Sequence, residues 1–496
     1  MSHLTRRQAL ISGGALGAFL PMVNACAPAK TVHATPDESK FTDGVRMAEL
    51  ISKGEMSALE AVNAAIDRAE AVEPKINAIA SKMYDSAREM AKSTPEGRLA
   101  GVPSFIKDLN DWKGAPTFYG SRAFKGYVAT SDHEISAAWR KAGIIPIGKS
   151  TSPELGLTAT TETFVTGASR NPWNTDYSTG GSSGGAGALV AARVVPFAHA
   201  TDGGGSIRIP ASCNGVFGPK PSRGRTYLRA SEPPVPISVS LAETITVRDS
   251  VAIFRVNQTG KYDELGAISG PSTRRLKIGM LTTPPTNKPA DPEVVEATEK
   301  AAELCKALGH EVIPFDFPAS VSIAEFVENF VLYWAAGAAE FIQQASKYTG
   351  KPPGTDIVEP LTLYLGNHFQ QNMSKFESAV AYLKGFEAVY DSWFESMDIL
   401  LTPTLPHLPF KIGEIGPETD PAAHFAKVID YATFTPLMNV SGAASMSVPL
   451  GWSKSGLPIG IMFSGKRGDD GKLYELAYEL EQAAPWVDKI PPVHAG

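Results

Sequence analysis

The sequence predicts an α/β protein with a single large domain, in which a mixed, mostly parallel central β-sheet is covered by helices on both faces. Segments with helical spacing alternate along the chain with short apolar segments, which is typical of sheets covered by helices. The chain has 496 residues, of which 43% are hydrophobic, enough for one large core. No repeat and no Pro/Gly-rich linker divides residues 41–496.

The first elements follow from apolar spacing and capping residues. Residues 48–51 and 58–62 carry apolar side chains at helical spacing, which predicts two helices. Ser57 followed by Glu60 is a capping-box pattern, and Gly54 is a typical residue to end the first helix. Two strands and the helix between them are then expected at 102–106, 144–148 and 134–141.

The later elements continue this alternation. A helix at 293–308 stops at Gly309. The variable region at about 319–395 is expected to be mostly helical. Further strands are expected at 194–198, 276–280, 398–401 and 444–448.

Residues 1–30 have the composition of an export signal. Arg6 and Arg7 precede a short, weakly apolar segment rich in Gly and Ala, which favours twin-arginine export to the periplasm. The segment is a poor membrane-spanning helix. Cys26 ends a sequence that resembles a lipoprotein box, so a lipid tether to the membrane is an alternative. Residues 31–40 form a polar linker.

Composition excludes several classes of function. A net charge of −6 and the absence of a long basic run argue against a nucleic-acid partner. Three cysteines are too few for a disulfide framework, and no Cys/His spacing resembles a metal site. Composition therefore predicts no nucleic-acid partner and no metal site.

The first candidate site is the Gly/Ser-rich segment 178–187. It lacks the Gly-Lys-Ser/Thr ending of a phosphate-binding loop. Residues 181–185 formally fit G-x-S-x-G with Ser183 as nucleophile, but that motif follows a strand, and residues 171–176 have a turn-like composition. A flexible linker is the remaining alternative.

The second candidate site is the segment 201–210, which follows the apolar strand predicted at 194–198. Here three glycines lead into Ser206. Such a sequence exposes consecutive backbone N–H groups beside a hydroxyl, as an oxyanion hole requires next to its nucleophile.

Taken together, these segments resemble the amidase signature family. Two Gly-flanked serines are separated by 24 residues, and Gly101-Val102-Pro103 precedes Lys107-Asp108. The resemblance covers nearly all of the chain after the signal and includes the segments 149–154, 170–174, 401–404, 439–442 and 456–460.

The resemblance implies a role for each residue of the two clusters. Ser206 would be the nucleophile, Ser182 a bridging serine preceded by a cis peptide bond, and Lys107 the base. The backbone N–H groups of the oxyanion hole would come from Gly203, Gly204, Gly205 and Ser206. The residues expected to hold the site in place are Ser183, Asp202 and Arg208, the last two as a buried pair.

The residues also support a lysine base independently. Neither cluster contains a histidine, and the nearest one, His199, lies in an apolar strand and is more simply explained as structural. A lysine base must be neutral, so its pKa of about 10.4 must fall by roughly three units. Burial supplies such shifts, and Phe105 and Ile106 precede Lys107.

The resemblance implies hydrolysis of C–N bonds in small uncharged amides, so we expect a small-molecule substrate, no metal or other cofactor, and a monomer or a homodimer. The sequence most resembles family members acting on nylon-type cyclic oligoamides and, more loosely, on urethanes. Alternatives are the glutamine-hydrolysing component of a tRNA amidotransferase, a broad esterase and a non-catalytic binding protein. Segments 319–395 and 410–435 are candidate pockets, although aromatic residues at helical spacing are also typical of a core: Phe326, Phe330, Tyr333 and Trp334.

Overall fold

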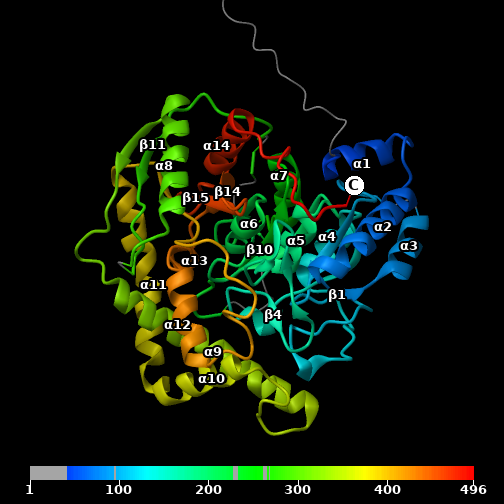
Figure 1. Cartoon of the computed structure of the whole chain (residues 1–496), viewed down its shortest axis with the longest axis horizontal. Helices are drawn as coiled ribbons and strands as arrows, with labels where there is room; N and C mark the ends of the chain where they lie inside the picture. Colours follow the sequence, from blue (N-terminus) through cyan, green and yellow to red (C-terminus); the bar gives the residue numbers. More distant parts are fainter. Residues whose placement is uncertain are drawn as a thin grey trace, which may run out of the picture. The chain divides into compact units, whose positions relative to one another are not determined.

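The computed structural model describes residues 42–93, 96–226, 233–260, 265–266, 268–286 and 288–495 (Figure 1). The predicted export signal, the linker and Cys26 lie outside these residues. Within the described ranges, no helix is both long enough and apolar enough to cross a membrane.

The first described elements are the helices α1 (Gly44–Ser52) and α2 (Ala58–Ile76), as predicted. Ser57 caps α2 by accepting the Glu60 N–H, and the Glu60 carboxylate accepts the Ser57 N–H. The next elements are β1 (Ile79–Lys82), α3 (Tyr84–Lys92), β2 (Pro103–Lys107), η1 (Arg122–Phe124), α4 (Glu134–Lys141), β3 (Ile145–Ser150) and η2 (Glu154–Gly156). The strands form a sheet in the order β1-β3-β2.

Strands β8 (Phe197–Asp202) and β10 (Val239–Thr244) form an antiparallel pair beside β2, where the Ser104 hydroxyl donates to the Phe197 carbonyl. Helices cover both faces of this region. Phe105 packs in the cluster of α2 and α5 (Gly184–Ala191), whereas the next residue, Ile106, packs in the cluster of α4 and α7 (Val247–Asn257). Successive strand residues point to opposite faces, so Lys107 points toward α5.

A six-stranded sheet forms the other part of the molecule, in the order β12-β11-β13-β15-β14-β9. Its strands are β9 (Gly218–Lys220), β11 (Lys277–Met280), β12 (Glu311–Pro314), β13 (Ile399–Pro403), β14 (Ser445–Trp452) and β15 (Pro458–Ser464). Helices α6 (Arg208–Asn214), α8 (Pro292–Ala307) and α14 (Asp470–Ala483) pack against this sheet.

The α/β class and the mixed sheets are confirmed, but the expectation of mostly parallel pairing is wrong. Only β2 with β3, β11 with β12, and β11 with β13 pair in parallel among the described strands. The other described pairs, such as β14 with β15, are antiparallel. The reason is local: β14 and β15 are joined by a short turn, which places consecutive strands antiparallel.

The turn predicted at residues 171–176 is confirmed only in part, because Pro172 and Trp173 form a turn but strands lie on either side of it. Strand β7 (Asn174–Ser178) pairs with β6 (Arg170–Asn171), and a second small ribbon joins β4 (Glu162–Thr163) to β5 (Gly167–Ala168). Strand β7 carries Asn174 and Asp176 and lies at the surface, so it lacks the apolar alternation that predicts a strand.

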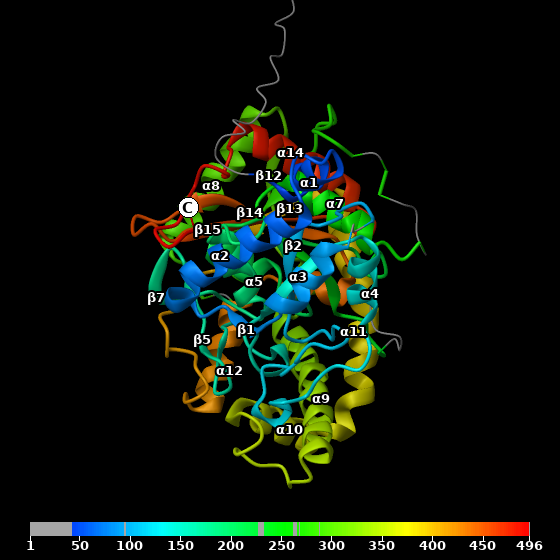
Figure 2. The ribbon, with the colours of Figure 1, turned by 90° about the vertical axis from the view of Figure 1, so that its right-hand side faces the viewer.

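The helices of the variable region lie side by side, with α9 and α10 at the lower end of the views in Figures 1 and 2. They are α9 (Ile323–Thr349), α10 (Pro360–Asn372), η3 (Met373–Lys375), α11 (Phe376–Ser392) and η4 (Trp393–Glu395). Helices α12 (Pro421–Tyr431) and α13 (Pro436–Ser441) follow β13. Helix α10 lies between α9 and α12, and α11 packs on both α9 and α13.

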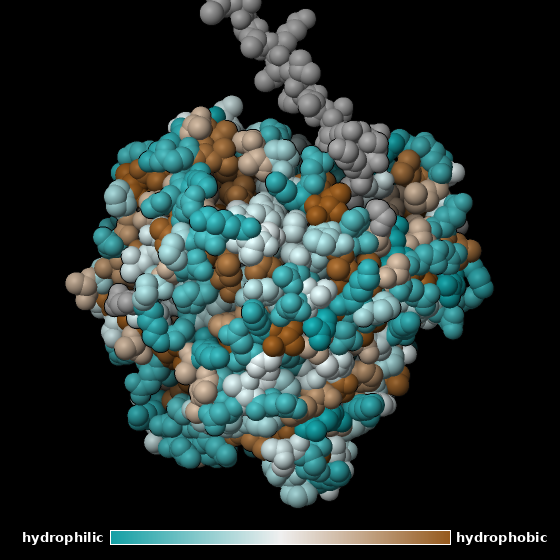
Figure 3. Space-filling model, in the orientation of Figure 1, coloured by the Kyte–Doolittle hydropathy of each residue, from teal (hydrophilic) through white to brown (hydrophobic). Residues whose placement is uncertain are grey.

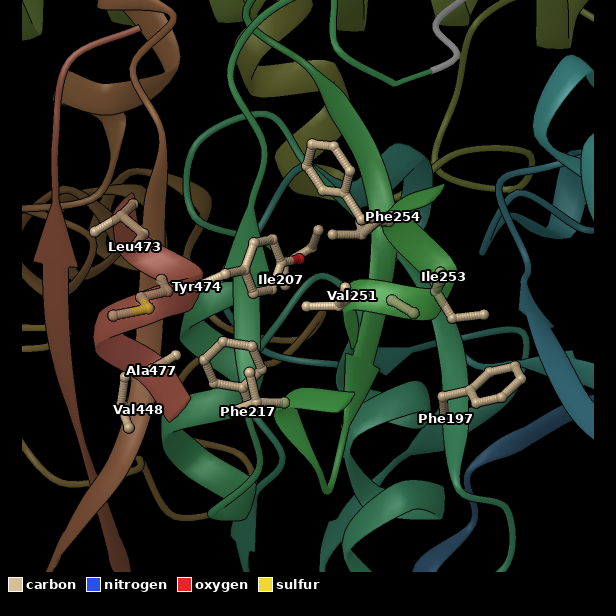
Figure 4. Packing of buried hydrophobic residues seen from close by; sticks show 14 of the residues in the cluster. Phe197, Ile207, Phe217, Val251, Ile253, Phe254, Val448, Leu473, Tyr474 and Ala477 are labelled. Atoms are coloured by element: carbon tan, nitrogen blue, oxygen red, sulfur yellow. The ribbon is translucent and has the colours of Figure 1, made fainter. Parts of the chain in front are cut away.

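The largest apolar cluster joins the two sheet regions. Phe254 of α7 and Phe217 both pack against Tyr474 of α14, and Ile207, which directly follows Ser206, belongs to the same cluster (Figure 4). The first turn after β8 is therefore fixed by the core. Figure 3 shows hydrophilic residues over most of the visible face, with hydrophobic residues in small groups.

Candidate active site

Lys107 is the last residue of β2 and its side chain is fully buried. Its Nζ lies 2.7 Å from the Ser182 Oγ, 2.8 Å from the Ser183 Oγ and 3.0 Å from the Thr201 Oγ1. Burial lowers the pKa of Lys107 to about 7, whereas the negative charge of Asp202, and a charge on Glu243 if that carboxyl were ionised, would act in the opposite direction. Near neutral pH this amine can therefore lose its proton while it contacts three hydroxyls.

Ser182 and Ser183 form the turn between β7 and α5. The Gly181–Ser182 peptide bond is cis, as the resemblance implied. A Cβ on Gly181 would lie 2.6 Å from the Thr160 carbonyl oxygen, so the position accepts only glycine. The Ser183 N–H donates to the Ser206 carbonyl at 3.3 Å, and this contact joins the two predicted clusters.

Ser206 lies in the turn between β8 and α6 and is 8% exposed. The N–H groups of Gly203, Gly204 and Ser206 have no hydrogen-bond partner within the described part of the chain. The Gly205 N–H instead donates to the Asp202 carboxylate at 2.8 Å, which corrects its predicted place in the oxyanion hole. Thr435 holds the same peptide from its other side by donating to the Gly204 carbonyl.

Asp202 and Arg208 form the buried pair that the resemblance implied, with two N–O distances of 2.9 Å and both side chains inaccessible. Arg208 holds the pKa of the Asp202 carboxyl far below its usual range. Asn439 completes the group, because its amide donates to Asp202 and its oxygen accepts from Arg208. Its segment, 439–442, carried the resemblance, but its contact with this pair was not predicted.

His199 is structural, as expected. Its Nδ1 accepts the Lys107 N–H at 3.3 Å, and its Nε2 lies 3.0 Å from the Ser240 Oγ. Burial lowers the pKa of His199 well below its ordinary value. Both ring nitrogens are therefore engaged away from Ser206.

The nucleophile-elbow alternative fails on contacts rather than on secondary structure. A strand and a helix do flank Ser183, as the motif requires. However, its fully buried Oγ donates to the Thr201 carbonyl and contacts Lys107. This hydroxyl is not open to a substrate.

Two cavities meet at Ser206. The wide one has a volume of about 500 Å³ and a mixed wall in which Ser182, Thr201, Asp111 and Asp132 supply polar groups. The narrow one has a volume of about 80 Å³ and an apolar wall. The residues of the narrow wall include Leu157, Ile209, Phe326, Phe330, Phe425, Val428 and Leu437.

Trp334 of α9 lines both cavities. Its indole Nε1 donates to the Leu157 carbonyl at 3.3 Å, which fixes the ring. A Cβ on Gly203 would lie 3.2 Å from this ring, so the indole lies directly on the glycine turn. Phe326, Phe330 and Trp334 therefore reach the pocket, whereas the Tyr333 hydroxyl donates to the Val235 carbonyl.

Comparisons with known proteins agree with this geometry. The Amidase family model matches residues 60–474. The chain belongs to the amidase signature family. It is similar to "Putative amidase AmiC" of Mycobacterium tuberculosis, with 39% identity over 92% of this chain and 98% of that protein.

Two further similarities concern amidase signature enzymes of named activity. The 6-aminohexanoate-cyclic-dimer hydrolase of Paenarthrobacter ureafaciens is 33% identical over 91% of this chain and 96% of that protein. The structure of a bacterial aryl acylamidase is 28% identical, with a TM-score of 0.82 over 91% of this chain and 99% of that one. This chain is accordingly a hydrolase of amide C–N bonds.

Proposed function

We propose that this enzyme hydrolyses small uncharged amides through an acyl-enzyme on Ser206, with Ser182 and Lys107 as its proton relay. The observation that carries the proposal is the 2.7 Å contact of the buried Lys107 Nζ with the Ser182 Oγ. A neutral amine has a lone pair, so it can take the proton of Ser182 while Ser182 takes that of Ser206. Ser206 then attacks the amide carbonyl carbon.

The glycine turn supplies the complementary charge stabilisation. As the carbonyl oxygen becomes negative, the N–H groups of Gly203, Gly204 and Ser206 are the donors available to it. One such donor is worth about 10²–10³-fold in kcat. The Asp202–Arg208 pair fixes the turn through the Gly205 N–H, which keeps these donors in place before substrate binds.

The two cavities support a placement for each part of the substrate. The leaving nitrogen must receive its proton from Ser182, and Ser182 lines the wide cavity but not the narrow one. The amine part therefore departs through the wide cavity, and the acyl part occupies the narrow apolar one. Water then enters on the vacated side and is activated by the same relay to hydrolyse the ester on Ser206.

The favoured substrates are amides with a slender or flat apolar acyl group, including anilides, linear or cyclic oligoamides and carbamates. The activities named for the cyclic-dimer hydrolase and the aryl acylamidase support this class. A panel of anilides, N-alkyl amides, carbamates and esters tests it. Selective hydrolysis of glutamine, with no activity on anilides or N-alkyl amides, would contradict it.

The nucleophile is tested by covalent labelling. A serine-directed acylating reagent should modify Ser206, as located by peptide mass, and Ser206→Ala should abolish both labelling and turnover. Ser183→Ala is the matched control, because it removes a neighbouring hydroxyl that does not open to the cavity. Modification of Ser183 in the unchanged protein would mean that the nucleophile is Ser183 and would contradict the proposal.

We also propose that the enzyme acts outside the cytoplasmic membrane. Arg6 and Arg7 at the start of the predicted signal support this location. Replacing both by lysine should leave the full-length precursor in the cytoplasm. Unchanged export of that variant would refute the twin-arginine route, and a lipid-modified Cys26 in the exported protein would establish a membrane tether.

A further inference from the structure

Three acceptor oxygens lie buried behind the two serine turns without a donor. They are both carboxyl oxygens of Glu243 and the amide oxygen of Asn214, and none has a hydrogen-bond partner within the described ranges. Glu243 lies on β10 opposite Ala198 of β8 and is fully buried. Buried polar groups in proteins are nearly always hydrogen-bonded, so this cluster requires an explanation.

Gly187 of α5 brings the two side chains together. A Cβ at this position would lie 2.6 Å from the Glu243 Oε2 and 2.7 Å from the Asn214 Nδ2. Both groups therefore occupy the space that the missing side chain leaves beneath α5. The titratable groups that face Glu243 are Lys107 of β2, Asp202 of β8 and the Cys213 thiol of α6.

The side-chain nitrogen of Asn214 already donates two hydrogen bonds. Nδ2 donates to the Thr179 carbonyl and to the Pro210 carbonyl, both at 2.8 Å. Thr179 lies three residues before Ser182, and Pro210 lies four residues after Ser206. Asn214 thus joins the two serine turns, and its oxygen still needs a donor.

We propose that Glu243 is a neutral carboxylic acid whose O–H donates to the Asn214 amide oxygen, and that it acts as a positioning residue for the Ser182 and Ser206 turns. An ionised carboxylate has no donor, whereas a protonated one has one, so protonation supplies the group that Asn214 lacks. Burial and the nearby Asp202 raise the pKa of Glu243 well above its ordinary value, against the opposing effect of Lys107.

The competing assignment is an ionised Glu243 that acts as the counter-charge of Lys107. The two assignments differ in Glu243→Gln, which is uncharged and retains an N–H donor at the same place. With the neutral acid, Gln leaves the acid limb of the kcat/KM–pH profile unmoved. With the ionised form, loss of the negative charge lowers the pKa of Lys107 and moves that limb to lower pH, which would overturn the proposal.

Glu243→Leu tests the positioning role. It leaves the Asn214 oxygen without a donor, so the two serine turns lose a contact that positions them, and a displacement of catalytic groups by about 1 Å can cost up to about 10²-fold in rate. We expect kcat to fall within that range with little change in KM, and Glu243→Gln to restore most of it. Equal loss in the Gln and Leu variants would overturn the proposal.

Infrared spectroscopy tests protonation without reference to any activity. The purified protein at neutral pH, compared with Glu243→Gln, should show one additional carbonyl stretch of a protonated carboxyl. An additional carboxylate stretch in its place would overturn the proposal, even if Glu243→Leu failed to fold. Because this measurement uses no substrate, its failure is distinguishable from failure of the proposed amide hydrolysis.

Discussion

Two buried lysines of this enzyme share a pKa but not an environment. Lys107 ends β2 and Lys220 ends β9, and neither side chain is more than 1% exposed. Burial lowers the pKa of each to about 7. The Lys107 amine contacts three hydroxyls, whereas the Lys220 amine donates to the Pro221 carbonyl at 2.8 Å.

The difference shows that burial produces a neutral lysine but does not by itself produce a base. A base also needs a hydroxyl to deprotonate and space for a substrate beside it. Ser182, which Lys107 contacts, lines a cavity of about 500 Å³, but the cavity beside Lys220 is only about 10 Å³. That is about enough for one water molecule. The predictions below test this distinction.

The largest expected effect separates the two lysines directly. Lys107→Met should lower kcat/KM for an anilide by about 10²–10⁴-fold, the usual contribution of general acid–base catalysis. Lys220→Met, the matched control, removes a buried lysine with the same pKa and should stay close to the unchanged protein. Comparable loss in both variants would mean that replacing a buried lysine lowers activity by disturbing the fold, and that Lys107 has no separate role as a base.

An amide–ester pair with the same acyl group sharpens this test. An amine leaves only when it is protonated, whereas a nitrophenolate leaves without help, so Lys107→Met should depress the amide reaction more. Equal loss on both substrates would limit Lys107 to the role of base.

The next largest effect concerns the serines that share Lys107. Ser182→Ala breaks the relay to Ser206 and should cost about 10²–10³-fold in kcat, within the range of acid–base catalysis. Ser183→Ala removes a hydroxyl about equally close to Lys107 that is fully buried and does not line the wide cavity, so its loss should be about tenfold or less. Steady-state kinetics of both variants measures this order, and the reverse order would place the relay on Ser183.

The sequence could predict this arrangement only in part. Lys107, Ser182 and Ser206 lie in motifs that resemble a known family, so their roles were accessible. Trp334 was one of several aromatic residues at helical spacing, and only its contact with Gly203 distinguishes it from core. The orientation of the Gly204–Gly205 peptide depends on the Asp202 carboxylate and on the hydroxyl of Thr435, which is distant in the sequence. Local composition does not encode these contacts.

The fold shows the same division. Helix caps and apolar periodicity are local, so α2 and its Ser57 cap were predictable. Strand direction depends on partners far along the chain: β13 pairs in parallel with β11 but antiparallel with β15. The sequence pattern of a strand carries no signal for that choice.

The pH dependence gives a smaller but diagnostic effect. The pKa of Lys107 is about 7, so below that pH the lysine is charged and cannot accept a proton. The kcat/KM for an anilide should therefore fall below pH 7, approaching roughly tenfold per pH unit. The same fall below pH 7 should appear in Lys220→Met. Its disappearance in that variant would mean that Lys220, and not Lys107, is the group that titrates.

The last expected effect is on stability rather than on activity, and it isolates the cost of burying Lys220. In the unfolded chain this lysine keeps its proton up to its ordinary pKa of 10.5, whereas in the folded protein it loses the proton above about 7. Folding therefore releases a proton between these pH values, and stability rises with pH across that window. Below pH 7 the full difference opposes folding, about 5 kcal/mol at 1.36 kcal/mol per unit.

Lys220→Met removes this pH-dependent cost, since a buried charge replaced by an apolar side chain of similar size is often stabilising. The free energy of unfolding of the variant should exceed that of the unchanged protein most at pH 6, and the excess should shrink steadily toward pH 10. Urea titrations at pH 6, 8 and 10 measure it. A pH-independent difference would show that Lys220 keeps its charge when buried, and the two lysines would then differ in ionisation as well as in contacts.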